Sequence, residues 1–272
     1  MARPPTMSAR LSIAAPGEHP DFLDLPLQEP LAEWRLPRLV DIPQGTHRHV
    51  VRFCDYSGSL YALKEMPAYL AHREYRLLRH LVGAGLPAVT PVGVVDRRGA
   101  SVDGILITRH LDFSLTYRVL LAEGHVPHLR ERILDALAGL LVRLHLAGFV
   151  WGDCSLANTL FRRDAGALTA YVVDTETGEL HAELANRERT GDVAIARANI
   201  ARDLGELREE GSLPPEADPH ETAAQIESRY TALWAQVTEE EVFPAGDTYR
   251  ITRRLRTLNA LGFDLEEMEI SR

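Results

Sequence analysis

Three polar side chains in the second half of the sequence have the types and spacing needed to hold a magnesium ion beside a hydroxyl group. Asp153 and Asn158 lie in one short polar segment, and Asp174 follows the apolar run Tyr171-Val172-Val173. A loop and the hairpin that follows it can bring these oxygen-bearing groups into one pocket. Because phosphoryl transfer needs oxygens to fix Mg²⁺ and to orient an acceptor, the spacing predicts a site for metal-assisted phosphoryl transfer.

A second pair of charged residues lies upstream, on a predicted strand and a predicted helix. The alternation of side chains along the strand places Ala62 and Lys64 on the same face. The helix, expected over 67–82, carries Glu74 within an apolar stripe. A buried carboxylate is costly unless it meets a cation, and Lys64 is the nearest candidate in sequence. We therefore expect Lys64 and Glu74 to form an ion pair.

Two groups of predicted elements must position these residues. The strands of the first group are expected at 39–42, 50–54, 60–64, 91–95 and 104–108. Beyond Arg109 the apolar spacing becomes helical, apart from a hairpin expected over 159–174. The helices of this second group are expected at 115–122, 127–147 and about 193–207, then from Asp218 and from about Asp247 onward.

This organisation predicts an α+β fold with two lobes, a small antiparallel β lobe with one helix and a larger α-helical lobe. The expected divisions are a tail and lead-in at 1–37, the β lobe at 38–108, the helical lobe with the polar loop at 109–263 and a C-terminal tail at 264–272. The first residues, up to about Pro20, are rich in Pro, Ala and Ser and are expected to be a loose tail.

Composition excludes several classes of protein. The formal net charge of −9 argues against a general binder of nucleic-acid backbones, which depends on Lys and Arg. Two cysteines, Cys54 and Cys154, are too few for a chain of 272 residues that depends on disulfides, so a reducing, cytoplasmic setting is expected. The most apolar stretch, 133–151, is interrupted by charged residues and predicts a buried amphipathic helix, not a membrane span. No signal peptide is recognised at the N-terminus.

The chain resembles the protein-kinase-like superfamily over about residues 39–176. The closest groups are the lipopolysaccharide-kinase-like and small-molecule kinases, including an uncharacterised bacterial family with the same Trp-Gly-Asp-Cys-Ser loop. The resemblance implies a bilobal kinase-like fold and the use of ATP with Mg²⁺. It rests on the order and context of Lys64, Glu74, Asp153, Asn158 and the motif Asp174-Thr175-Glu176.

The resemblance implies roles for the residues of the polar loop and the following hairpin. Asp153 is expected to orient or deprotonate the acceptor hydroxyl. Asn158 and Asp174 are expected to bind Mg²⁺, with Glu176 as a further metal oxygen. Asp192 has two open interpretations, an anchor for the catalytic loop or an N-terminal helix cap. His145 and Cys154 are expected to be structural, His145 through a bond to a backbone carbonyl and Cys154 as a small packed side chain.

The resemblance also implies how ATP is held. Lys64, braced by Glu74, is expected to position the phosphates, and adenine is expected to lie against Ala62 and the connector 109–111. The loop 43–49 has one glycine where protein kinases have three, so His47, Arg48 and His49 are expected to supply side-chain donors.

Departures from the protein-kinase pattern narrow the expected acceptor. Trp151-Gly152 replaces the His-Arg that precedes the catalytic aspartate, which removes the arginine that reads a phosphorylated activation loop. No Ala-Pro-Glu follows Asp174, and the interval to the next helix is short. The usual platform for a peptide is therefore missing, and a small molecule, a sugar or a lipid-linked glycan is the expected acceptor.

The sequence supports three functional hypotheses. The first is an ATP- and Mg²⁺-dependent phosphotransferase whose partners are ATP and a hydroxyl acceptor. The second is a catalytically weak or inactive nucleotide-binding regulator, which the atypical glycine loop motivates. The third is an enzyme that transfers AMP from a nucleotide bound in reverse. The acceptor and the oligomeric state stay open at this level.

Overall fold

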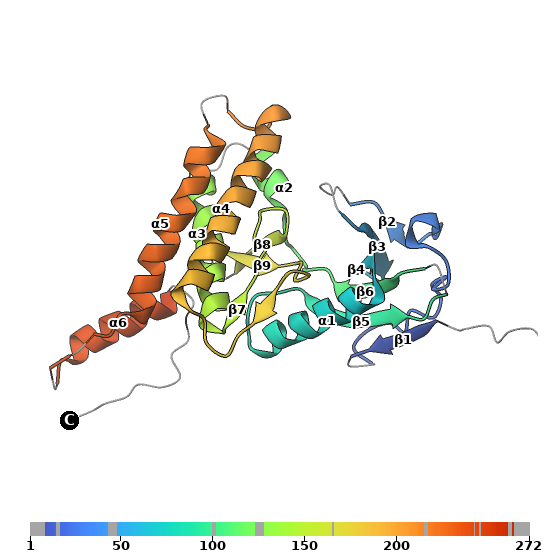
Figure 1. Ribbon diagram of the computed structural model, residues 1–272, viewed down its shortest axis with the longest axis horizontal. Coiled ribbons are helices and arrows are strands. Elements are labelled where there is room, and N and C mark those ends of the chain that lie inside the picture. Colours follow the sequence, from blue (N-terminus) through green and yellow to red (C-terminus); the bar gives the residue numbers. More distant parts are fainter. Residues whose placement is uncertain are drawn as a thin grey trace, which may run out of the picture.

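Six segments of the N-terminal part pair into one antiparallel sheet. The computed structural model describes residues 9–14, 17–42, 48–99, 102–122, 128–164, 166–214, 217–241, 243–244, 246–260 and 263. The strands are β1 (Arg10–Ile13), β2 (Leu39–Val40), β3 (Val50–Tyr56), β4 (Ser59–Met66), β5 (Thr90–Asp96) and β6 (Gly104–Arg109), in the order β1-β5-β6-β4-β3-β2 (Figure 1). The five expected strands are present, and β1 is an additional strand.

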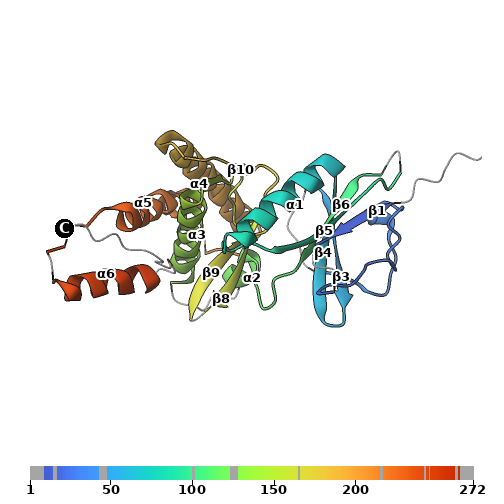
Figure 2. The ribbon, with the colours of Figure 1, turned by 90° about the horizontal axis from the view of Figure 1, so that it is seen from below.

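The two faces of this sheet are covered by different segments. On one face, Tyr61 and Leu63 of β4 are buried in a cluster that includes Phe22, Leu31 and Trp34. On the other face, the helix α1 (Ala68–Gly83) packs against β5 and β6 (Figure 2), and Lys64 of β4 reaches this helix. The predicted alternation along β4 is therefore confirmed.

The lead-in to the sheet is part of the first lobe, which corrects the expectation of a tail and lead-in at 1–37. The strand β1 pairs with β5, and Phe22, Leu31 and Trp34 are fully buried. The short 3₁₀ turn η1 (Leu31–Glu33) is fixed by a hydrogen bond from the Leu31 amide to Glu65, 3.0 Å long. The physical reason is that the outer face of the sheet is apolar and needs a cover. This segment has no regular period, so pattern analysis missed it.

The second lobe is mainly helical. Its elements are α2 (Tyr117–Ala122), α3 (Leu129–Leu146), β7 (Phe149–Val150), β8 (Thr159–Asp164), β9 (Ala167–Val172), β10 (Glu179–Leu180), α4 (Asn186–Glu209), α5 (Pro219–Thr238) and α6 (Thr248–Ala260). The long helices α3, α4 and α5 pack together, and α6 extends away from them (Figure 1). The expected tail at 264–272 and the expected helix start at Pro127 lie outside the described residues.

A glycine turn connects the buried helix α3 to the polar loop. Gly148 has a φ of +75°, and a Cβ atom there would lie 2.2 Å from the carbonyl oxygen of His181. Its amide donates to the carbonyl of His145 over 3.1 Å, so this glycine closes the C-terminal end of the helix. The chain leaves α3 through this turn, forms β7 and enters the loop of Asp153.

Helix α3 contains most of the apolar stretch 133–151, for which the sequence predicted a buried helix and not a membrane span. In the part of the chain that the structure describes, every helix is too short or too polar to cross a membrane. Helix α3 is instead buried along most of its length within the second lobe. Cys54 and Cys154 are both free and buried.

The fold predicts that truncating Phe22 will destabilise the protein. The Phe22 ring meets Tyr56 and Tyr61 edge to face, with centroids 5.2 and 5.1 Å away. We expect Phe22→Ala to lower the free energy of unfolding by about 3 to 5 kcal/mol, because a fully buried ring is lost. The neighbouring Leu23 is 73% exposed, so Leu23→Ala should change it by less than about 0.5 kcal/mol. Urea unfolding measures the free energy of unfolding of both variants, and equal losses in the two would contradict the packing of this segment.

Candidate active site

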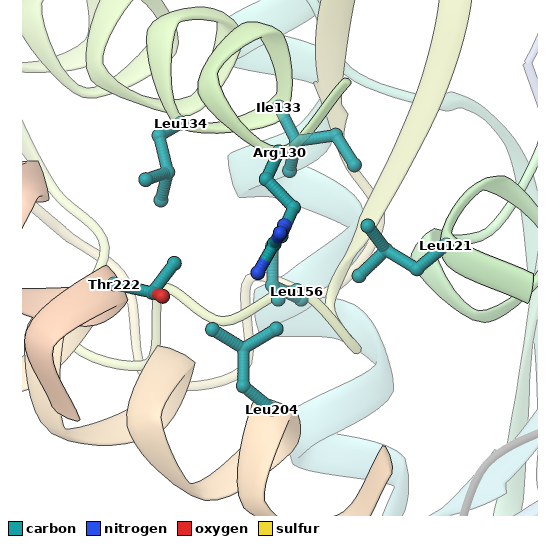
Figure 3. Close-up of a pocket in the computed structure, with 7 residues that line it drawn as sticks. All are labelled: Leu121, Arg130, Ile133, Leu134, Leu156, Leu204 and Thr222. Atoms are coloured by element: carbon teal, nitrogen blue, oxygen red, sulfur yellow. The ribbon is translucent and has the colours of Figure 1, made fainter. Parts of the chain in front are cut away.

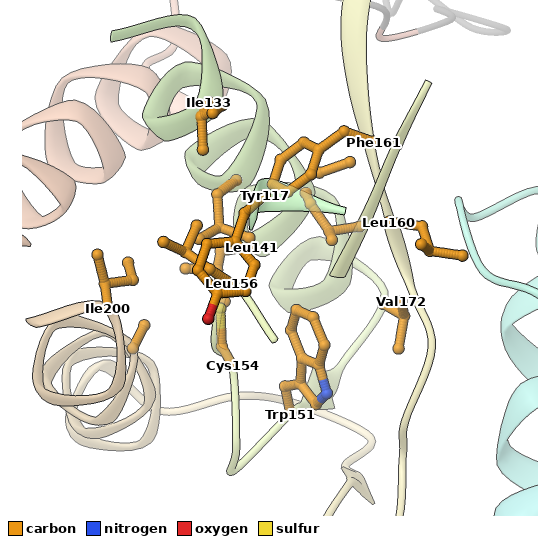
Figure 4. Close-up of a cluster of buried hydrophobic side chains, with 14 of the residues drawn as sticks. Tyr117, Ile133, Leu141, Trp151, Cys154, Leu156, Leu160, Phe161, Val172 and Ile200 are labelled. Carbon is orange, nitrogen blue, oxygen red and sulfur yellow. The ribbon is translucent and has the colours of Figure 1, made fainter. Parts of the chain in front are cut away.

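The loop that carries Asp153 is anchored in the core of the second lobe by three apolar side chains. Trp151, Cys154 and Leu156 are buried and point into the cluster shown in Figure 4. Burial raises the pKa of the Cys154 thiol well above its ordinary value, so this side chain packs as a neutral group. Asp153 and Asn158 are less buried than these anchors. The loop therefore holds its polar side chains at the edge of a rigid core.

Asp192 of helix α4 holds the start of the loop. One carboxylate oxygen accepts from the amide of Trp151 and the other from the amide of Gly152, each over 2.8 Å. Asp192 lies inside α4, six residues after its first residue Asn186, so it is a loop anchor and not a helix cap. Of the two open interpretations, the structure favours the anchor.

Glycine is required at position 152 for two reasons. Its φ is +74°, a conformation that other residues rarely adopt. A Cβ atom there would also lie 3.2 Å from the carbonyl oxygen of Thr177. The hydroxyl of Thr177 donates to the carbonyl of Trp151 over 2.8 Å, so the segment after Asp174 packs directly on the loop.

The carboxylate of Asp153 is held by two amide side chains. Asn158 donates from Nδ2 to Oδ2 over 2.9 Å and to the Asp153 carbonyl over 3.0 Å. Asn199 of helix α4 donates from Nδ2 to Oδ1 over 2.9 Å. Sequence reasoning missed Asn199. The sequence signal that could have identified Asn199 is its spacing of seven residues from Asp192, because residues seven apart lie on one face of a helix.

The hairpin register places Asp174 beside Asn158. Thr159 pairs with Val172, and the amide of Val173 donates to the Asn158 carbonyl over 3.1 Å. The indole nitrogen of Trp151 donates to the Asp174 carbonyl over 2.6 Å. The structure therefore brings Asp153, Asn158 and Asp174 together, as their spacing predicted.

The chemistry of these side chains fits a magnesium ion. Asn158 turns its amide nitrogen toward Asp153, which leaves its amide oxygen for a metal, and the Asp174 carboxylate lies at the adjacent hairpin end. Carboxylate and amide oxygens are the ligands that Mg²⁺ prefers. Within the described ranges, no group of three or more His, Cys, Asp and Glu side chains could hold a metal unaided.

Lys64 connects the two lobes. Its ammonium lies 3.0 Å from Glu74 Oε2, 2.6 Å from Asp174 Oδ2 and 3.8 Å from Glu176 Oε2. Burial alone would lower the pKa of Lys64, but the carboxylates of Glu74 and Asp174 outweigh it and raise the pKa. The expected ion pair with Glu74 is present.

Glu74 is the most buried group of this cluster. Its side chain is 1% exposed. Burial and the nearby charge of Asp174 raise the pKa of Glu74 to about 8, although the Lys64 ammonium opposes the change. The burial of Glu74 therefore favours its neutral form, and the Lys64 ammonium favours its charged form.

Glu176 contacts the residues that immediately precede β3. Its carboxylate lies 2.8 Å from His49 Nε2 and 3.7 Å from an Arg48 nitrogen. Arg73 of α1 donates to its carbonyl and, over 2.8 Å, to that of Gly178. Arg48 thus lies beside Glu176, and His47 lies outside the described residues.

The expected adenine wall lies where β4 meets the connector. Ala62 pairs with Phe53 on one side and Thr108 on the other. The amide of His110, in the connector, donates to the carbonyl of Leu60 over 2.8 Å. Ala62, on an inner strand of the sheet, and the connector are therefore neighbours.

His145 has the structural role that we expected, but with different partners. Its Nδ1 lies 2.7 Å from the Tyr230 hydroxyl and its Nε2 lies 3.0 Å from Asp192. These side chains replace the backbone carbonyl of the prediction. The ring braces the carboxylate that holds the loop, and Tyr230 extends the connection to α5.

A small pocket of the second lobe is separate from this cluster. Figure 3 shows its lining, which is mostly apolar and of which only Leu156 belongs to the polar loop. None of the predicted site residues lines it. Its lining residues are Leu121, Arg130, Ile133, Leu134, Leu156, Leu204 and Thr222. The pocket therefore belongs to the packing behind the loop.

Two family models match the sequence. The model of the lipopolysaccharide kinase (Kdo/WaaP) family matches residues 54–203, just over half of the 272-residue chain. A domain of unknown function (DUF4032) matches residues 232–272. No curated protein matches the chain. The first match contains Lys64, Glu74 and the whole loop of Asp153.

Solved structures share the fold. A structure of WaaP in complex with acyl carrier protein is similar with a TM-score of 0.53 and 17% identity, over 93% of this chain and 99% of that chain. A structure of an aminoglycoside-3'-phosphotransferase of type VIII has a TM-score of 0.48 and 15% identity, over 80% of this chain and 92% of that chain. The likeness to WaaP confirms the bilobal kinase-like fold.

The geometry of the loop predicts a large effect of removing Asp192. We expect Asp192→Ala to lower the free energy of unfolding by about 3 to 5 kcal/mol, because three buried donors lose their acceptor. Thr190→Ala on the exposed side of the same helix should change it by less than about 0.5 kcal/mol. Urea unfolding followed by circular dichroism measures both variants. A loss below about 1 kcal/mol for Asp192→Ala would contradict the anchoring role.

Proposed function

We propose that this chain moves the γ-phosphate of ATP to a hydroxyl group of a non-protein acceptor. The premise is that the chain belongs to the lipopolysaccharide kinase (Kdo/WaaP) family and is a kinase-like phosphotransferase. The observation that carries the proposal is the single ammonium of Lys64, 3.0 Å from Glu74 of the first lobe and 2.6 Å from Asp174 of the second. In phosphoryl transfer, protein groups mainly position the reactants and neutralise charge.

The nucleotide would lie between the lobes. Lys64, held by Glu74, would contact the phosphates, and Arg48 at the cleft edge would add a second positive charge. Ala62 and the connector 109–111 would form the wall for adenine. The contacts between Lys64 and the carboxylates of Asp174 and Glu176 would loosen when phosphates take their place.

Asn158 and Asp174 would hold Mg²⁺, and Glu176 would supply a further oxygen, directly or through water. The bound ion would neutralise charge on the phosphates of ATP. Asp153 would orient the acceptor hydroxyl and receive its proton. The hydrogen bonds from Asn158 and Asn199 hold the Asp153 carboxylate ready for this task.

The acceptor class follows from the segment after Asp174. Only the short strand β10 lies between Asp174 and helix α4, which begins at Asn186, and β10 pairs with β7. This segment offers no extended surface for a peptide. A sugar or a lipid-linked glycan is the acceptor that the family suggests, and a small molecule is the broader class. The cytoplasmic location expected from the two cysteines remains a prediction.

Calorimetric titration of ATP tests the metal site without knowledge of the acceptor. We expect the wild-type protein to bind ATP in the presence of Mg²⁺ and Asp174→Ala to bind at least about 10-fold more weakly, because a charged metal ligand is lost. Asp164→Ala removes a carboxylate at the other end of the same hairpin and should leave binding unchanged. An affinity for ATP that changes neither with Mg²⁺ nor with the Asp174 substitution would favour the hypothesis of a nucleotide-binding regulator.

The role of Asp153 predicts loss of transfer with retained ATP binding. We expect Asp153→Ala to reduce phosphate transfer at least about 100-fold, because the acceptor loses its orienting base, while the affinity for Mg²⁺ and ATP stays within about 2-fold. Mass spectrometry of a pool of sugars and glycans incubated with ATP measures the product. Full activity of the variant would contradict this role, and a product that gains AMP would establish the third hypothesis.

A further inference from the structure

Helix α4 presents three polar side chains to the catalytic loop in the order in which the loop runs. Asp192 binds the amides of Trp151 and Gly152. Asn199, about two turns later, binds Asp153 and Cys154. Asp203, one turn further, accepts from the amide of Ala157 over 3.1 Å. The loop is thus tied to one rigid helix at its start, middle and end.

Asn199 differs from its two neighbours because it touches the side chain of Asp153. Asp192 and Asp203 bind only backbone groups of the loop. Asn199 Nδ2 donates over 2.9 Å to Asp153 Oδ1 and over 3.2 Å to the Cys154 carbonyl. It therefore sets the direction of a carboxylate as well as the path of the chain.

The orientation of the Asn199 amide is determined by its surroundings. Its nitrogen faces two acceptors, the Asp153 carboxylate and the Cys154 carbonyl. Its oxygen accepts from Arg202 over 3.1 Å. A flipped amide would place two acceptors against its oxygen and a donor against its nitrogen. Arg202 also donates to Asp203 over 3.1 Å, so the guanidinium ties the two loop-binding side chains together.

The two amides on Asp153 belong to different parts of the molecule. Asn158 lies on the same loop, and its amide oxygen is the group that would bind Mg²⁺. Asn199 comes from the interior of α4 and is braced by Arg202. Of the two partners of Asp153, Asn199 is therefore the one that a helix holds in place.

We propose that Asn199 is a positioning residue for phosphoryl transfer, which fixes the Asp153 carboxylate toward the acceptor hydroxyl through its bond to Oδ1. This inference rests on the proposed function, since it takes Asp153 as the group that orients the acceptor. The residue acts through Asp153 and does not touch the reacting atoms. A carboxylate held by only one amide would rotate, and the distance to the acceptor would vary.

A double-mutant cycle tests this role with Mg²⁺, ATP and water as the acceptor. Phosphate release is measured for the wild type, Asn199→Ala, Asp153→Ala and the double variant. We expect Asn199→Ala to lower kcat about 10-fold to 100-fold with unchanged KM for ATP and an unchanged melting temperature. In the Asp153→Ala background, the same substitution should have no further effect, because the group that it positions is gone.

Two variants separate positioning from anchoring. Asp203→Asn weakens the acceptor of a backbone amide of the loop and leaves the Asp153 side chain untouched, so its effect should be the same in both backgrounds. Asn199→Asp keeps the size of the side chain and the acceptor for Arg202, but it cannot donate to Asp153. We expect its kcat to fall at least as far as that of Asn199→Ala. Equal effects of Asn199→Ala with and without Asp153 would overturn the positioning role.

The cycle also separates this inference from the proposed function. Phosphate release that is unchanged in Asp153→Ala would contradict the proposed function itself. A second measurement needs no turnover and uses crystals of wild type and Asn199→Ala with Mg²⁺ and a non-hydrolysable ATP analogue. We expect the Asp153 carboxylate to rotate in the variant, and an unchanged orientation would overturn the inference.

Discussion

The structure depends on one desolvated cation shared by carboxylates from two lobes. Lys64 of β4 is held by Glu74 of α1 and reaches Asp174, at the end of the hairpin β8-β9. A buried charge is tolerated only when its partners are close, so the strand, the helix and the hairpin end must keep their relative positions. This requirement places Glu74 of the first lobe close to Asp174 of the second. The raised pKa of Glu74 reflects the same burial.

Helix α4 solves a second physical problem, because an irregular loop beside a buried core has backbone groups without partners. The buried carboxylates of Asp192 and Asp203 accept from these amides, and His145 braces the first of them. Trp151, Cys154 and Leu156 fix the same loop from the apolar side (Figure 4). The loop is therefore fixed from both its polar and its apolar side by side chains of the second lobe.

Sequence patterns predicted the parts of the molecule that have a local cause. The alternation in β4 and the apolar stripe of α1 correctly paired Lys64 with Glu74. The spacing of polar residues in the loop and the hairpin predicted that Asp153, Asn158 and Asp174 lie together. The cover of the sheet by 22–34 was not predicted, because irregular segments have no period. The partners of His145 were also missed, since they come from two other helices.

By itself, the sequence determined the two-lobed α+β fold, the order of the site residues and the departures that point away from a peptide acceptor. Tertiary structure alone decided that Asp192 anchors the loop and that Asn199 holds Asp153 across 46 residues of sequence. Local spacing determines which residues share a face of a strand or a helix. It does not determine which face meets a loop, because that depends on how helices pack around a common core.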